Sequence, residues 1–166
     1  MNISYADSLE EYSLSIDVKS TKVDQYKTIY YDFSIKKKIF SNFNIGFQYS
    51  HAKFNDSDDK YLTIGIYPSF HYGVSFGYSK KYNNFYYTLG FLAGYGLSRT
   101  ISKFSSDVIG DCKCSTFITE PYMSVSYKII KNTSFGAQIS YFMISSASEQ
   151  ANSSSVAYSA ILNYHW

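Results

Sequence analysis

The chain has 166 residues, of which 20% are aromatic and only 17% are charged, and its formal net charge is +2. This composition excludes a disordered chain, which would be poor in aromatic residues and rich in charge. The charge excess is too small to indicate a nucleic-acid-binding protein. No apolar run approaches the roughly 20 residues that a transmembrane helix needs, so helical membrane proteins are excluded as well.

Apolar and polar residues alternate in eight segments, and a period of two indicates strands with one apolar face. In chain order the segments are 9–19, 28–36, 43–53, 61–79, 85–98, 119–129, 134–144 and 155–166. The pattern is clearest in the last segment, where every second residue from Val156 to Trp166 is apolar or aromatic. Segment 61–79 keeps one parity throughout and is predicted to be a single strand, with Pro68 at a bulge or beyond the paired region. The alternative is a break near Pro68 that would give nine strands.

The connections alternate in length. Short ones lie at 80–83 and 130–133, and 37–42 belongs with them although it is less tight; longer ones lie at 54–60, 99–116 and 145–154, and 20–27 is the remaining loop. Tight turns at one end and longer loops at the other are typical of up-and-down membrane barrels, which in bacteria have even strand numbers. We therefore predict an all-β chain, an eight-stranded antiparallel up-and-down transmembrane β-barrel that occupies residues 1–166 as a single domain.

The polar face carries the small and charged residues. Eight of the nine glycines lie on it, which favours a crowded barrel interior over a solvent-exposed face, where glycine would only weaken a strand. Buried charges must pair. We predict an interior polar network of the following residues: Asp17, Asp32, Lys36, Glu120 and Lys128.

Aromatic residues of the apolar face gather at both ends of the strands. Amphipathic rings favour membrane–water boundaries, so this placement predicts two girdles around an aliphatic band. The predicted girdle residues are Tyr78, Phe85, Tyr87, Tyr127, Phe135, Tyr158, Tyr164 and Trp166. The alternative is that aromatic residues simply favour strands, and their two-ended placement favours girdles.

With these features the chain resembles the small outer-membrane β-barrels of Gram-negative bacteria, the OmpA/OmpX type. The resemblance covers essentially the whole chain but is one of pattern, and its most specific element is the last strand with its terminal aromatic residue, Trp166, where that family usually has Phe. It implies that both termini face the periplasm and that the longer loops face outside. Residues 1–7 lack the basic and apolar regions of a signal peptide, so either a cytosolic protein or a mature form with an added Met1 is expected.

Few residues indicate chemistry. Cys112 and Cys114 are predicted to be a disulfide or an incidental loop pair rather than metal ligands, because a metal site needs more ligands at defined spacing. Ser50, His51 and Asp56 are of the types used in acyl transfer, and the resemblance adds that outer-membrane lipid A acylases and deacylases place such residues near the outer rim. Their spacing matches no motif, so no catalytic residue, metal or cofactor is predicted.

The resulting functional prediction is an integral protein of the bacterial outer membrane with a structural or surface-interaction role, such as adhesion or host-factor binding. Its expected partners are outer-membrane lipid and lipopolysaccharide, together with a host or cell-surface ligand of loops 54–60, 99–116 and 145–154. No nucleic-acid partner is expected, and the protein is expected to be a monomer. The alternatives are a lipid A-modifying acyl-transfer or deacylation enzyme, a pore, and a soluble barrel or sandwich that binds a small ligand.

Overall fold

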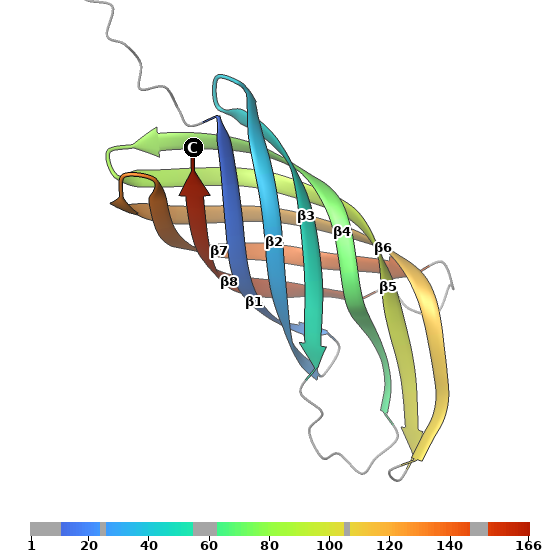
Figure 1. Ribbon diagram of the computed structural model, residues 1–166. Coiled ribbons are helices and arrows are strands. Elements are labelled where there is room, and N and C mark those ends of the chain that lie inside the picture. Colours follow the sequence, from blue (N-terminus) through green and yellow to red (C-terminus); the bar gives the residue numbers. More distant parts are fainter. Residues whose placement is uncertain (1–10, 24–25, 55–62, 105–106, 147–152) are drawn as a thin grey trace, which may run out of the picture.

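Eight antiparallel strands close into one barrel in sequence order, because β1 pairs with both β2 and β8 (Figure 1). This computed structural model describes residues 11–23, 26–54, 63–104, 107–146 and 153–166, and side chains within 11–22, 28–52, 70–97, 115–145 and 154–166. The strands are β1 (Tyr12–Val23), β2 (Tyr26–Phe40), β3 (Phe43–Phe54), β4 (Thr63–Tyr82), β5 (Phe85–Phe104), β6 (Asp107–Ile130), β7 (Thr133–Ser146) and β8 (Ser153–His165). The predicted fold class is confirmed. The described part of the chain contains no helix with the length and apolar character needed to cross a membrane.

Strand β4 runs without a break through Pro68, so the nine-strand alternative is wrong. The pairing of β4 with β5 shifts register between Pro68 and Phe70, as in a β-bulge. Proline has no N–H to donate to the ladder, and a bulge is one of the few places where a strand tolerates it.

Several strands are longer than the alternation predicted. Most of the predicted loop 99–116 is strand, since β5 continues to Phe104 and β6 begins at Asp107. The gap between β7 and β8 likewise narrows from 145–154 to residues 147–152. Hydrophobic alternation marks only the part of a strand with one apolar face, whereas the backbone hydrogen bonds of a ladder do not depend on that alternation and can continue beyond it.

The three short turns have two residues each, at 41–42, 83–84 and 131–132. Ser41 and Asn83 adopt positive φ angles of 39° and 53°, as type I′ and II′ hairpin turns have at their first central position. The second residue of each turn is asparagine, and its carbonyl oxygen accepts a backbone N–H from the strand that follows the hairpin, at 2.7 Å for Asn42 and Asn84 and 2.8 Å for Asn132. These bonds hold each turn to the neighbouring strand at one end of the barrel, which we call the turn end.

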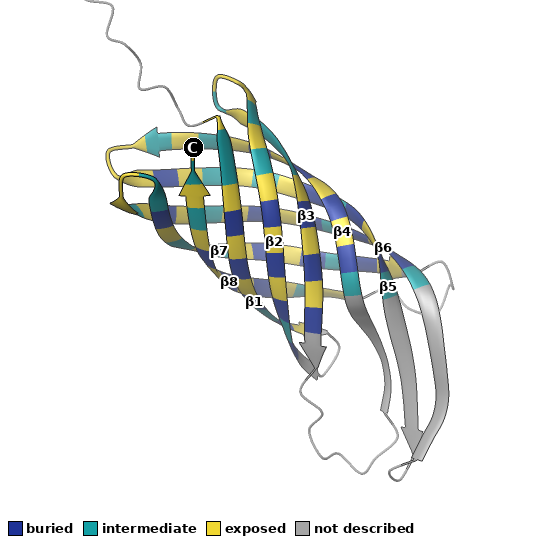
Figure 2. Cartoon of the chain, viewed as in Figure 1, coloured by how far each residue is buried: buried dark blue, intermediate teal, exposed yellow. Residues whose placement is uncertain are grey.

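The two faces of the barrel wall differ as the pleat requires. Exposed and buried residues alternate along the strands (Figure 2), with large apolar side chains outside and mostly small or polar ones inside. Leu14, Ile16 and Val18 of β1 are exposed, for example, whereas Ser15, Asp17 and Lys19 are buried.

Candidate functional site

The outer surface is an apolar band that surrounds the barrel. Phe33 on β2, Phe47 on β3 and Phe76 on β4 are each about half exposed. Soluble monomers rarely expose contiguous apolar surface of this extent. The structure places all eight predicted girdle residues on this outer face, namely Tyr78, Phe85, Tyr87, Tyr127, Phe135, Tyr158, Tyr164 and Trp166.

The middle of the barrel is occupied by a lysine held between two carboxylates. The Nζ atom of Lys19 lies 2.7 Å from Asp32 Oδ2 and 2.8 Å from Glu120 Oε2, and all three side chains are at most 1% exposed. Gln48 donates a further hydrogen bond to Asp32 at 3.2 Å. These contacts tie β1, β2, β3 and β6 together across the lumen. We call Lys19, Asp32 and Glu120 the central ion cluster.

Sequence reasoning missed Lys19 and included Lys128. Asp17, Asp32 and Glu120 are buried inside the barrel, and Lys36 lies with its Nζ 5.2 Å from the ring centre of Tyr122. Lys128 lies eight residues beyond Glu120 on the same strand, about 26 Å away at the rise of an extended chain, so the structure does not bring it to the cluster. Lys19 could have been assigned to the interior from its position in the alternation, because it follows the outward residue Val18 and lies on the same face as Asp17.

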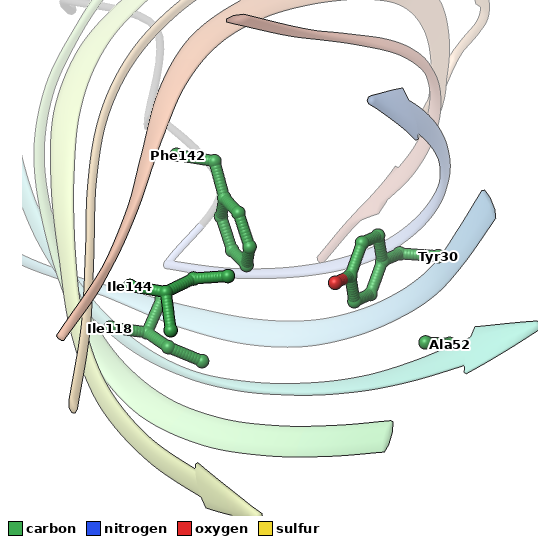
Figure 3. Close-up of a cluster of buried hydrophobic side chains, with 5 residues drawn as sticks. All are labelled: Tyr30, Ala52, Ile118, Phe142 and Ile144. Atoms are coloured by element: carbon green, nitrogen blue, oxygen red, sulfur yellow. The ribbon is translucent and has the colours of Figure 1, made fainter. Parts of the chain in front are cut away.

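Next to the ion cluster, toward the loop end, lies an apolar layer. It consists of Tyr30, Ala52, Ile118, Phe142 and Ile144, all buried, and Figure 3 shows the rings of Tyr30 and Phe142 and the two isoleucines inside the barrel. The buried ring of His71 lies 5.8 Å from Tyr30 and 5.6 Å from Phe142. Large, fully buried side chains in both layers fill the middle of the lumen, as the narrow interior of an eight-stranded barrel permits.

The interior glycines allow close packing around these layers. Gly73 on β4 is paired with Gly94 on β5. A Cβ atom at Gly94 would lie 2.6 Å from the carbonyl oxygen of Tyr72 and 3.1 Å from the Cα of Gly73. Backbone atoms cannot move away as a flexible side chain can, so this pair leaves no room for side chains.

At the turn end the lumen widens into a polar cavity of about 100 Å³. Hydroxyl and amide groups line it and bond to one another: Ser15 donates to Asn163 at 2.7 Å, and Asn44 donates to Ser79 at 2.9 Å. Asp17 and Lys36 form part of its lining. The cavity therefore ends at the charged layer that fills the middle of the barrel.

The weak catalytic candidates are not brought together. Ser50 is fully buried inside the barrel, where its hydroxyl accepts a hydrogen bond from Gln48 at 3.3 Å, whereas His51 is exposed on the outer face. Adjacent residues of a strand point to opposite faces, so these two side chains cannot act as a pair. Asp56 lies outside the described residues. Among the described residues, no group of three or more His, Cys, Asp or Glu side chains is arranged to hold a metal ion.

The two cysteines lie in a strand rather than in the predicted loop. Cys112 and Cys114 belong to β6, where their backbones pair with Thr100 and Ser98 of β5. In an extended strand the Cα atoms of residues i and i+2 lie about 6.6 Å apart, which is near the upper limit of the Cα–Cα distance across a disulfide. Their side chains lie outside the described part, and the disulfide stays a prediction.

Comparison with known proteins shows the fold but no sequence relative. No protein-family model matches the chain, and no curated protein matches it in sequence. The crystal structure of Neisserial surface protein A (NspA) matches with a TM-score of 0.68 and 15% identity, over 96% of this chain and 100% of that one. Ail, the attachment invasion locus protein of Yersinia pestis, matches with a TM-score of 0.60 and 13% identity, over 95% and 99% of the two chains. The N-terminal β-barrel domain of Pseudomonas aeruginosa OprF matches with a TM-score of 0.59 and 9% identity, over 95% and 100%.

These matches span nearly the whole chain and agree with the closed order of its eight strands. The chain therefore has the fold of the small eight-stranded outer-membrane β-barrels of the OmpA/OmpX type.

Proposed function

We propose that the protein is an integral component of a bacterial outer membrane whose loop end takes part in surface interactions such as adhesion or host-factor binding. The observation that carries the location is the continuous band of outward apolar side chains around a closed barrel. A closed barrel leaves no unpaired strand edge in the hydrocarbon, which is the condition for crossing a membrane with strands. The filled lumen favours an anchoring role over a pore.

The loop end supports an interaction role because three strands extend past the others (Figure 1). The pairing of β3 with β4 ends at His51 and Phe70, and that of β6 with β7 ends at Thr116 and Ser146. Beyond these points β4, β5 and β6 pair only with one another among the described strands. A projecting ribbon of this kind presents backbone edges and side chains to a partner. NspA is described as a surface protein and Ail as an attachment invasion locus protein, which agrees with this role.

Gel mobility and solubility test the location. A folded barrel in detergent is expected to migrate as a compact species until it is boiled, and to require detergent for extraction. Solubility without detergent, with no mobility shift, would contradict the membrane proposal and favour the soluble alternative.

Labelling of intact cells tests the orientation. Cys112 and Cys114 are the two cysteines of the chain and both lie in the projecting part of β6. A membrane-impermeant maleimide, applied after mild reduction, is expected to label them from outside. Labelling only after the cells are broken would contradict an outward loop end.

Shortening the ribbon tests the interaction. In the shortened variant, Leu97 of β5 is joined to its pairing partner Ser115 of β6 by a two-residue turn. The projecting parts of β5 and β6 are then removed, and the strand pairs of the closed barrel are kept. Cells carrying the variant are expected to bind cultured host cells less than cells carrying the intact protein, at equal surface amounts and with an unchanged mobility shift. Equal binding would contradict adhesion through this ribbon.

A further inference from the structure

The turn end of the barrel is strongly basic. Its three turns and the strand ends beside them carry six lysines, namely Lys37, Lys38, Lys80, Lys81, Lys128 and Lys131. Lys37, Lys80 and Lys131 are exposed, and the other three are half-buried. The acidic side chain described at this end is Glu11, which lies 3.5 Å from Lys37. At the opposite, loop end the sequence has similar numbers of acidic and basic residues in segments 20–27, 54–60, 99–116 and 145–154. The turn end therefore presents a positive rim directly beside the apolar band.

Three aromatic rings stack on the outer wall where β8 closes onto β1. Trp166 lies with its ring centre 5.9 Å from that of Tyr12, at an interplanar angle of 15°, and 5.9 Å from that of Tyr164, at 29°. The backbones of Tyr12 and Trp166 exchange two hydrogen bonds of 3.0 Å, which fix the stack at the seam of the barrel. Tyr164 and Trp166 are about half exposed on the outer face. We call Tyr12, Tyr164 and Trp166 the seam stack.

One lysine contacts the seam stack, and a second lies in a turn that is bonded to the strand carrying it. On one side the Nζ of Lys37 lies 5.1 Å from the ring centre of Tyr12. On the other side Lys131 is exposed in the β6–β7 turn, and the next residue, Asn132, accepts a backbone hydrogen bond of 2.8 Å from His165. Cationic groups therefore stand at the edge of an exposed aromatic surface, which is where a lipid headgroup meets its acyl chains.

We propose that the seam stack with Lys37 and Lys131 is a binding site for an anionic glycerophospholipid. The rings would lie against the glycerol and upper acyl chains, and the two ammonium groups would face the headgroup phosphate. Each lysine near a membrane surface favours anionic lipid, and Glu11 offsets part of the effect of Lys37. The site rests on the proposed membrane location, and it adds a lipid preference that the fold itself does not require.

The single tryptophan of the chain is Trp166, so its fluorescence reports on lipid at this site alone. The full-length protein is folded into phosphatidylcholine vesicles that contain either brominated phosphatidylglycerol or brominated phosphatidylcholine at equal mole fraction. We expect the brominated anionic lipid to quench Trp166 with an apparent association constant about fivefold higher, and the preference to shrink in high salt.

Matched variants distinguish binding at this site from a general attraction between the basic protein surface and anionic lipid. Lys37→Gln and Lys131→Gln are each expected to lower the preference for the anionic lipid over phosphatidylcholine, and the double variant is expected to abolish it. Glu11→Gln is expected to raise this preference. Lys22→Gln is the control, because Lys22 is exposed on β1 at the opposite, loop end of the barrel. Folding of every variant is checked by its mobility shift on heating.

Equal quenching by the two lipids, or an unchanged preference in the double variant, would overturn the lipid site and leave the membrane proposal intact. The same holds if Lys22→Gln lowers the preference as much as Lys37→Gln. Absence of quenching by either lipid in a folded protein would instead contradict the membrane location itself.

Discussion

Replacing Lys19 by methionine tests the central ion cluster most directly. The substitution keeps most of the side-chain volume but leaves the carboxylates of Asp32 and Glu120 buried without the ammonium group that lies 2.7 and 2.8 Å from them. Removing one partner of a buried ion pair typically costs about 3–5 kcal/mol, because the remaining charge has no solvent to stabilise it. We therefore expect Lys19→Met to lower the free energy of unfolding by about that amount.

The free energy is measured by urea unfolding of the protein in lipid vesicles, followed by Trp166 fluorescence and by the heat-dependent mobility shift. A triple variant, Lys19→Met with Asp32→Asn and Glu120→Gln, removes all three charges together and is expected to recover most of the lost stability. Lys22→Met, an exposed lysine on the same strand, is expected to have little effect and serves as the control. The reasoning is refuted if Lys19→Met stays within about 1 kcal/mol of the unmodified protein, or if the triple variant is as unstable as the single one.

Three further outcomes are expected. Ser41→Gly should raise stability by about 1 kcal/mol in the same urea assay, because glycine adopts the φ of 39° without the steric cost that serine bears, and a decrease would contradict this view of the turn. Gly94→Leu should prevent the mobility shift, because its side chain would meet the backbone of Tyr72 and Gly73; a normal shift would mean that the wall can open there. Phe33→Lys, in the middle of the apolar band, should cost about 2–4 kcal/mol in vesicles, whereas Tyr82→Lys beside a turn should cost little, and equal effects would argue against the band as a hydrocarbon contact.

The barrel could be predicted from the sequence because the pleat imposes a period of two on every strand. Wherever one face is apolar, as at Val156 to Trp166, the alternation assigns each side chain to the inside or the outside, and the structure has the same faces. The strand extensions were not predictable in this way. At Asp107 to Ser115 the pairing continues into a part of β6 whose large apolar residues, Val108 and Ile109, are neighbours in sequence and do not alternate with polar ones, so no apolar period marks it.

The interior contacts could be predicted only in part. The alternation of faces along each strand places Asp32 and Glu120 inside the barrel, but it does not predict which lysine forms ion pairs with them. Lys19 and Glu120 are 101 positions apart in the chain, and their contact depends on the tilt and stagger of strands around a closed barrel. The apolar layer was missed for a related reason, since Phe142 and Ile144 occupy a face that is otherwise small and polar and gain apolar neighbours only across the lumen.

The pairing of the first strand with the last has a consequence for how the protein is made. Ser13 pairs with His165, so the barrel cannot close until almost the entire chain is present, and closure is the most non-local step of folding. Until then β1 and β8 each have an open edge and an apolar face, a state prone to aggregation in water and costly in lipid. Closure therefore follows the synthesis of the last strand, and the chain is exposed to aggregation in the interval between the two.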